Sequence, residues 1–194
     1  MKSKRFKTVR EFWDTIDEWT DPTIQHAIFH ENVPNHEEFY EECLAHDKWT
    51  RATAAGMTKG YTHTLHDHNL KTHNPNRKHR ENWGRWFAIP KPETFPKISK
   101  FFEDNKRQYK YPVISKLDAG ESINAHNHGG VGVPFIYNMC INFPKNTYFA
   151  IYPTGFVPYT PGDIYKLYIH NDHSVVNKSK TDRYHIMIRP TRAF

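Results

Sequence analysis

The sequence is short of cysteine and of long hydrophobic runs. Its two cysteines, Cys43 and Cys140, lie far apart in unlike surroundings. This excludes a disulfide framework and the paired spacing of a zinc knuckle, and it is typical of a reducing compartment. No stretch approaches the ~20 apolar residues of a membrane span, and the basic first residues lack the apolar run of a secretory signal. We therefore expect a cytoplasmic protein with no membrane partner.

Aliphatic residues are also scarce, but aromatic residues compensate for them. Hydrophobic residues make up 37% of the chain, and aromatic residues alone reach 15%, which argues against a disordered chain. A length of 194 residues suffices for one domain with a sizeable core and is too short for two ordinary domains. The net charge of +6 permits an acidic partner. Because the sequence assigns this charge to no single face, a nucleic-acid partner is not expected.

Helical patterns dominate residues 1–110. Apolar residues at helical spacing predict an amphipathic helix over residues 8–20. Asn35 is a suitable helix cap, and the acidic residues that follow it favour a helix start, so a second helix is predicted over residues 35–55. A third helix is predicted over residues 93–107, with its aromatic side chains facing inward. We expect these helices to serve packing.

From Tyr111 onward the pattern changes to short β-strands separated by turn residues. Strict alternation places Arg183, His185 and Met187 on one face of the last strand. The predicted strands cover residues 111–117, 123–128, 135–143, 148–152, 163–169 and 183–189. Many short strands of this kind predict a sandwich or barrel. We therefore expect one domain that is mainly β with helical decoration, an α+β fold.

Residues 57–82 contain an unusual number of histidines in a polar segment. A histidine-rich tract can bind metal. This spacing, however, fits no closed zinc site, and the neighbouring arginine and lysine residues would repel a cation. We interpret the segment as a long surface loop that serves as a lid or contacts substrate, with histidines that do not bind metal.

Three histidines and an arginine in the C-terminal half form a more specific pattern. His126 and His128 are two residues apart on an extended segment, so their side chains should point to the same side. His173 follows a later apolar run, and Arg183 begins another strand-like run ten residues further on. Neutral imidazoles suit a first-row transition metal such as iron, and three facial ligands leave positions open for substrate and oxygen. Arginine presents a charged planar fork that suits a carboxylate near that metal.

The region from about Val113 to Pro190 resembles the aspartyl/asparaginyl β-hydroxylase-like branch of the 2-oxoglutarate oxygenases, which also includes free-proline hydroxylases. The matching residues are Ser115, Gly120, His126, Phe143-Pro144, Gly162-Asp163, His173 and Arg183. The first 110 residues take no part in the resemblance. The resemblance implies a double-stranded β-helix, the jelly-roll or cupin-like fold, over residues 111–194, preceded by N-terminal helices.

The resemblance also implies roles for these residues. Family members bind Fe(II) through histidines at the places of His126 and His173. Their arginine at the place of Arg183 holds the distal carboxylate of 2-oxoglutarate, assisted by a serine at the place of Ser115. The resemblance thus implies that residues 1–194 form a single catalytic domain. This domain would use Fe(II) and 2-oxoglutarate to hydroxylate an amino-acid side chain, such as peptidyl Asp or Asn, or a free amino acid.

Three further site residues are expected from position. Two residues after the first ligand, family members carry aspartate or glycine, but this chain has His128, which suggests a three-histidine metal site. Some members clamp the other end of 2-oxoglutarate with an arginine and a histidine, whose places here are held by Ile136 and Asn138. Asn138 can donate a hydrogen bond there, although the charge is missing. His185 shares a strand face with Arg183 and should support it.

Two alternatives remain open. The missing carboxylate clamp at Ile136 favours a three-histidine cupin that uses iron and oxygen without 2-oxoglutarate, as thiol dioxygenases do. The spacing of His173 to Arg183 and the place of Ser115 point against that alternative. The chain could also be a non-catalytic jelly-roll binding module whose basic charge and aromatic loops serve an acidic partner or nucleic acid. The presence of three histidines together with the arginine makes this module the weaker alternative.

Overall fold

The computed structural model describes residues 6, 8–51, 84–128 and 135–190, and over these residues the fold is mainly antiparallel β. The helices are α1 (Val9–Asp14), α2 (Ile16–Trp19), α3 (His36–Ala45) and α6 (Pro96–Asp104). The strands are β1 (Ala27–Asn32), β2 (Thr50–Arg51), β3 (Arg85–Ala88), β4 (Tyr109–Leu117), β5 (Ser122–His126), β6 (Ile136–Cys140), β7 (Thr147–Ile151), β8 (Gly155–Phe156), β9 (Asp163–Leu167), β10 (His173–Asn177) and β11 (Arg183–Pro190). The histidine-rich segment 57–82 lies outside the described residues.

The strands form two sheets. The larger sheet has the order β1-β9-β6-β11-β4-β3-β2, and the smaller sheet has the order β5-β10-β7-β8. All recorded strand pairs are antiparallel, and the chain passes repeatedly from one sheet to the other. This arrangement confirms the predicted jelly-roll, cupin-like core with helical decoration.

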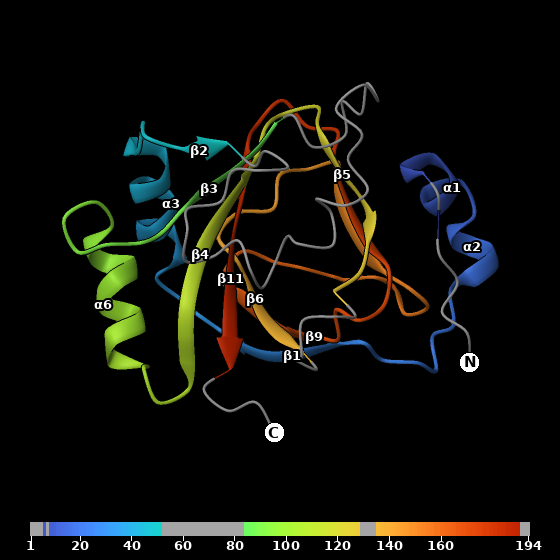
Figure 1. The fold of residues 1–194 in the computed structure, drawn as a ribbon, viewed down its shortest axis with the longest axis horizontal. Coiled ribbons are helices and arrows are strands. Elements are labelled where there is room, and N and C mark those ends of the chain that lie inside the picture. Colours follow the sequence, from blue (N-terminus) through green and yellow to red (C-terminus); the bar gives the residue numbers. More distant parts are fainter. Residues whose placement is uncertain (1–5, 7, 52–83, 129–134, 191–194) are drawn as a thin grey trace.

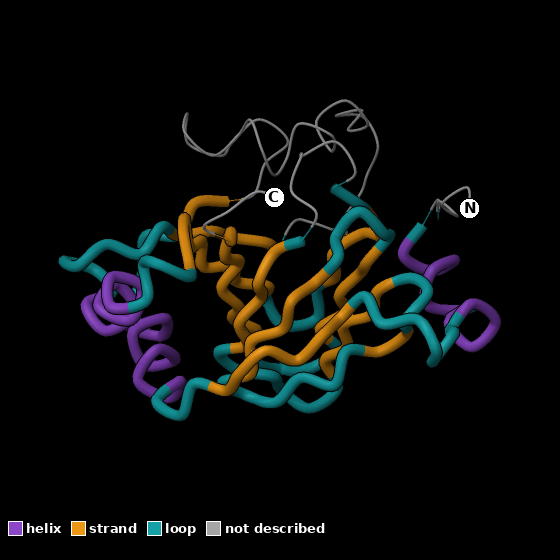
Figure 2. The backbone as a smooth tube through the Cα atoms, turned by 90° about the horizontal axis from the view of Figure 1, so that it is seen from below, coloured by secondary structure: helices purple, strands orange, loops and turns teal. Residues whose placement is uncertain are grey.

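Three apolar clusters organise the layers. One cluster lies between the two sheets and includes Val113, Leu117 and Phe149. A second cluster packs α3 and α6 against the outer face of the larger sheet, and a third packs α1 and α2 against the smaller sheet. Figures 1 and 2 show the resulting order, with helices at both ends and the strands between them. Both sheets are therefore covered on their outer faces, and polar side chains between them are shielded from water.

The three predicted helices exist, but all are shorter than predicted. Residues 8–20 form two helices separated at Thr15, whose hydroxyl donates to the Glu11 carbonyl at 2.8 Å. The third helix begins at Pro96, a residue favoured in the first turn of a helix. Its first amides donate to the Glu42 carboxylate of α3, with the Lys97 amide at 2.6 Å. This contact joins the two helices that cover the larger sheet.

The prediction of helix over residues 35–55 is wrong for residues 46–51, and residues 52–55 lie outside the described part of the chain. The chain leaves the helix at His46, whose carbonyl accepts a hydrogen bond from the Trp49 indole at 2.8 Å. The His46 ring also packs on Phe95 with a centroid distance of 4.5 Å. These tertiary contacts override the local helical pattern, and β2 follows at Thr50.

Strands β1 and β3 were not predicted for the N-terminal part. β1 pairs with β9 at one edge of the larger sheet, and β3 pairs with β4 near the other edge. The N-terminal part therefore contributes to the sheet that forms the jelly roll as well as to its helical cover. Among the described residues, no helix is long and apolar enough to cross a membrane.

Candidate metal centre and carboxylate site

A cavity between the two sheets brings together every site residue predicted from the sequence. Its lining also contains Arg85, which the sequence reasoning missed. The lining residues are Arg85, Ser115, Ile123, His126, His128, Ile136, Asn138, Phe149, Leu167, Ile169, His173, Val175, Arg183, His185 and Met187. None of them is acidic.

His126 and His173 lie side by side on neighbouring strands of the smaller sheet. They are register partners in the β5–β10 pair, and their ring centroids are 4.3 Å apart. The Nδ1 atom of His126 lies 2.7 Å from the Asn124 carbonyl, and the Nδ1 atom of His173 lies 3.0 Å from the Asn171 carbonyl. Because a carbonyl only accepts, each Nδ1 carries the proton and each Nε2 keeps its lone pair. This is the orientation that a metal-binding histidine needs.

His128 joins this pair from the segment that follows β5. Its amide donates to the Ile169 carbonyl at 2.8 Å, and the neighbouring Asn127 side chain donates to Asp172 at 2.5 Å. A ligand atom from each of His126, His128 and His173 lies within 4.8 Å of the others. The prediction that His126 and His128 point to the same side is therefore confirmed.

The protonation of the histidines suits a metal. Burial, followed by the nearby His173 and His128, holds the pKa of His126 well below its usual range. Burial also lowers the pKa of His173 to about 4. Both rings are therefore neutral at physiological pH and have an unprotonated Nε2 aimed at one point. This donor set fits a first-row divalent ion such as iron, and it contains no carboxylate that would favour magnesium or calcium.

Arg183 lies on the opposite wall of the cavity. It is only 2% exposed, and its Nε and one terminal nitrogen lack hydrogen-bond partners among the described residues. Burial lowers its pKa to about 10, so the side chain stays charged at neutral pH. Ser115 lies on the adjacent strand β4, also facing the cavity. A buried guanidinium with unused donors matches the predicted carboxylate anchor.

His185 does not support Arg183 directly, contrary to expectation. Its Nδ1 lies 2.6 Å from the Asn138 Oδ1, which also accepts a hydrogen bond from the Tyr159 hydroxyl at 2.8 Å. Asn138 is thus the acceptor at the centre of a buried network. The Nε2 of His185 has no hydrogen-bond partner in the segments that the structure describes, and burial holds the pKa of His185 well below its usual range. The alternation of β11 still places Arg183 and His185 on the same face, as predicted.

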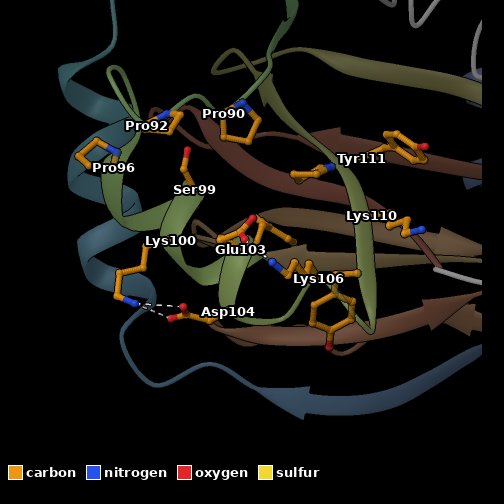
Figure 3. A pocket seen from close by; sticks show the side chains of 13 residues that line it. Pro90, Pro92, Pro96, Ser99, Lys100, Glu103, Asp104, Lys106, Lys110 and Tyr111 are labelled. Atoms are coloured by element: carbon orange, nitrogen blue, oxygen red, sulfur yellow. Dashed lines mark hydrogen bonds and ion pairs between the residues drawn. The ribbon is translucent and has the colours of Figure 1, made fainter.

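A second depression lies on the outer surface, away from the histidines. It is lined by residues of α6, the start of β4 and the prolines before them (Figure 3). The charged residues of α6 and the turn after it are exposed and form ion pairs there, as for Lys100 and Asp104 at 2.8 Å. Solvated pairs of this kind carry little energy and suggest no chemistry. The cavity between the sheets is the stronger candidate for the functional site.

No protein-family model and no curated protein sequence matches this chain. Solved structures do match. The non-heme alpha ketoglutarate dependent epimerase SnoN from nogalamycin biosynthesis is 8% identical, with a TM-score of 0.53 over 90% of this chain and 81% of that chain. A 2OG-Fe(II) oxygenase family oxidoreductase from Burkholderia pseudomallei is 12% identical, with a TM-score of 0.41 over 54% of this chain and 64% of that chain. A cupin domain from Bordetella pertussis Tohama I is 18% identical, with a TM-score of 0.33 over 44% and 83%.

These identities establish similarity of fold alone. The SnoN similarity extends over most of both chains, and it agrees with the jelly-roll arrangement of the two sheets. Because no family model matches, the aspartyl/asparaginyl β-hydroxylase-like assignment stays a prediction. The chain has a cupin-like β fold with three histidines positioned to bind a metal ion.

Proposed function

We propose that this protein is an Fe(II)- and 2-oxoglutarate-dependent oxygenase that hydroxylates an amino-acid side chain or a free amino acid. One observation carries the proposal: a three-histidine cluster and a buried, unpaired Arg183 face each other across one cavity. The similarity to SnoN is one of fold, so the proposal depends on these residues.

Each wall has a separate task in this proposal. His126, His128 and His173 would hold the iron, which supplies the activation of dioxygen for attack on an unactivated carbon–hydrogen bond. Arg183 binds the distal carboxylate of 2-oxoglutarate through its free donors, beside Ser115. Asn138 lines the same wall, and its Oδ1 accepts from His185 and Tyr159, which leaves its amide Nδ2 to donate to the co-substrate.

The apolar lining keeps water out of the site. Phe149 stacks near His173 with a ring centroid distance of 6.1 Å, and Val175 and Ile169 are buried beside it. Exclusion of water strengthens the arginine–carboxylate contact and prevents side reactions of the activated oxygen. The interior position of the cavity therefore favours oxidative chemistry over the binding of a large partner surface.

An oxygen-consumption assay tests the proposal. Protein loaded anaerobically with Fe(II) is mixed with oxygenated buffer, 2-oxoglutarate and a pool of free amino acids and Asp- and Asn-containing peptides, and succinate is quantified. We expect succinate only when iron, oxygen and 2-oxoglutarate are all present, and none from His173→Gln. Oxygen consumption without any need for 2-oxoglutarate would instead favour the three-histidine dioxygenase alternative, which the absence of a carboxylate ligand supports.

A further inference from the structure

Arg85 is a second buried arginine in the same cavity, and no sequence pattern singled it out. It is 6% exposed, and its Nε has no hydrogen-bond partner within the described part of the chain. Its guanidinium lies 4.7 Å from the centre of the Phe87 ring, and a terminal nitrogen makes a weak 3.9 Å contact with the Met187 sulfur. The neighbours of Arg85 are therefore an aromatic ring and a thioether, and its Nε–H group is available to donate a hydrogen bond.

The sheet register places Arg85 and Arg183 on either side of one residue. Leu117 of β4 pairs with Arg85 of β3 on one side and with Arg183 of β11 on the other. All three face the space between the sheets. Neighbouring strands are ~4.8 Å apart, so the two arginine backbones are separated by roughly 10 Å. They form two distinct anchoring points on one wall.

No carboxylate in the described part of the chain compensates these charges. The cavity lining contains no Asp or Glu, and neither arginine has an ion pair among the described residues. Burial and the neighbouring Arg183 lower the pKa of Arg85 to about 10, which leaves it charged at neutral pH. A buried charge without a partner lowers the free energy of unfolding. Two such charges in one cavity therefore indicate a site for an anionic ligand, which would compensate them.

The charges in the cavity exceed what the co-substrate supplies. A divalent ion on three neutral histidines adds two positive charges to those of Arg85 and Arg183, for a total of four. 2-Oxoglutarate brings two negative charges, so an excess of two remains. Arg85 and Arg183 both line the cavity that holds the three histidines.

We propose that Arg85 binds a carboxylate of the primary substrate, in the cavity that the three histidines line and separate from the co-substrate anchor at Arg183. This inference rests on the proposed function and narrows its substrate class to acids. The carboxylate belongs either to a free amino acid or to an acidic side chain of a peptide. A neutral internal peptide segment would leave Arg85 unpaired.

Ligand-observed NMR on Mn(II)-loaded protein with saturating 2-oxoglutarate tests this proposal. Mn(II) broadens the proton signals of any small molecule held near the centre. Propionate and propionamide form a matched pair that differs only in the carboxylate. We expect propionate to bind at least tenfold more tightly than propionamide. A free amino-acid pool and N-acetyl-aspartyl methylamide then distinguish the two sources of the carboxylate.

Matched variants assign the effect to Arg85. Arg85→Gln should abolish the preference for propionate and change the 2-oxoglutarate affinity less than threefold, whereas Arg183→Gln should weaken 2-oxoglutarate at least tenfold. Arg85→Lys should retain part of the preference. The exposed Arg107→Gln should behave as wild type. Metal-free Arg85→Gln should melt at the same or a higher temperature than wild type, because an unpaired buried charge is removed.

Three results would overturn the proposal. Equal binding of propionate and propionamide by wild type would show that the cavity does not select a carboxylate in addition to 2-oxoglutarate. A loss of 2-oxoglutarate affinity in Arg85→Gln as large as in Arg183→Gln assigns Arg85 to the co-substrate instead. A lower melting temperature with unchanged probe binding makes Arg85 a structural residue. If wild type binds no 2-oxoglutarate, the proposed function fails, and the probe titration without 2-oxoglutarate still tests Arg85 independently.

Discussion

The two walls of the cavity, one from each sheet, differ in whether their polar side chains have hydrogen-bond partners among the described residues. On the smaller sheet, the spare Nδ1 hydrogens of His126 and His173 are satisfied by backbone carbonyls, and both rings are neutral. On the larger sheet, Arg85 and Arg183 are charged, buried and lack partners for several donors. The first wall is preorganised by the protein itself, while the second wall keeps donors that have no partner among the described residues and that suit an anion.

This difference indicates that the inner face of the larger sheet contains groups that lower the stability of the fold and suit ligand binding. The outer face of the larger sheet is covered by α3 and α6 through an apolar cluster, and the described groups there carry no comparable unpaired charge (Figure 1). The inner face of the same sheet exposes two guanidinium groups to a cavity without acids. Unsatisfied buried polar groups of this kind are expected at functional sites.

Removing a ligand from the histidine wall should have the largest effect. His173→Gln removes an imidazole Nε2 from the cluster, so we expect the affinity for Fe(II) or Mn(II) to fall more than about 100-fold, beyond the loss typical of residues that only support a ligand. Anaerobic calorimetric titration measures this loss. The exposed His170→Gln is the control and should bind metal as wild type. A His173 variant with unchanged affinity would place the metal elsewhere in the chain.

The neutral histidine wall also predicts a pH dependence of stability. The pKa of His173 is about 4 in the folded protein and near 6.5 as its ordinary value, so the unfolded chain binds the proton more tightly. The contribution of neutral His173 to the free energy of unfolding is fully present above pH 6.5 and is lost as the pH falls toward about 4. For metal-free protein the shift corresponds to about 3 kcal/mol of unfolding free energy.

Urea unfolding between pH 7.5 and pH 4 measures this dependence. His173→Gln should flatten the loss of unfolding free energy over that range, and His170→Gln should leave it unchanged. A pH dependence that is the same in both variants would show that His173 is not neutralised by burial.

A substitution of Arg183, on the larger-sheet wall, should change the affinity for 2-oxoglutarate and leave the affinity for metal nearly unchanged. Arg183→Lys keeps the charge but loses the planar fork, and we expect it to weaken 2-oxoglutarate binding about tenfold to 100-fold, which corresponds to about 1.5–3 kcal/mol. Titration of Mn(II)-loaded protein with 2-oxoglutarate checks this. Metal affinity should change less than threefold. If metal and co-substrate affinity fall together, the two walls do not act separately.

The third histidine should give the smallest effect. His128 follows the end of β5 and lies outside the register pair that His126 and His173 form. His128→Gly should weaken metal binding about tenfold, and His128→Asp should preserve it, because a carboxylate completes the common facial triad. Comparison of the two variants by metal titration decides the point. Unchanged affinity in His128→Gly would mean that two histidines suffice.

Local signals in the sequence predicted part of the smaller-sheet wall, but the strand β10 that carries His173 was not among the predicted strands. His126 and His128 share a side through a spacing of two, and the β-like pattern of the C-terminal strands is unambiguous. Arg183 and His185 were placed on one face by strand alternation alone. Their partners across the sheets were supplied by the family resemblance, since no local pattern contains them.

Arg85 and β1 could not be predicted because their environment is set by distant residues. Arg85 follows an unremarkable Trp-Gly segment, and only its pairing with Leu117 brings it to the cavity. β1 is mostly exposed, so it lacks the alternation that identifies a half-buried strand, and it is held by its pairing with β9. A buried arginine without an acid nearby is recognisable as functional from coordinates and not from sequence.

Anomalous diffraction from an anaerobic crystal with Mn(II) and 2-oxoglutarate tests the central claim most directly. We predict one strong Mn(II) peak bonded to the Nε2 atoms of His126 and His173 and to His128. The distal carboxylate of 2-oxoglutarate should lie within hydrogen-bond distance of Arg183. A peak within the histidine-rich segment 57–82, or a 2-oxoglutarate molecule that does not contact Arg183, would contradict the account.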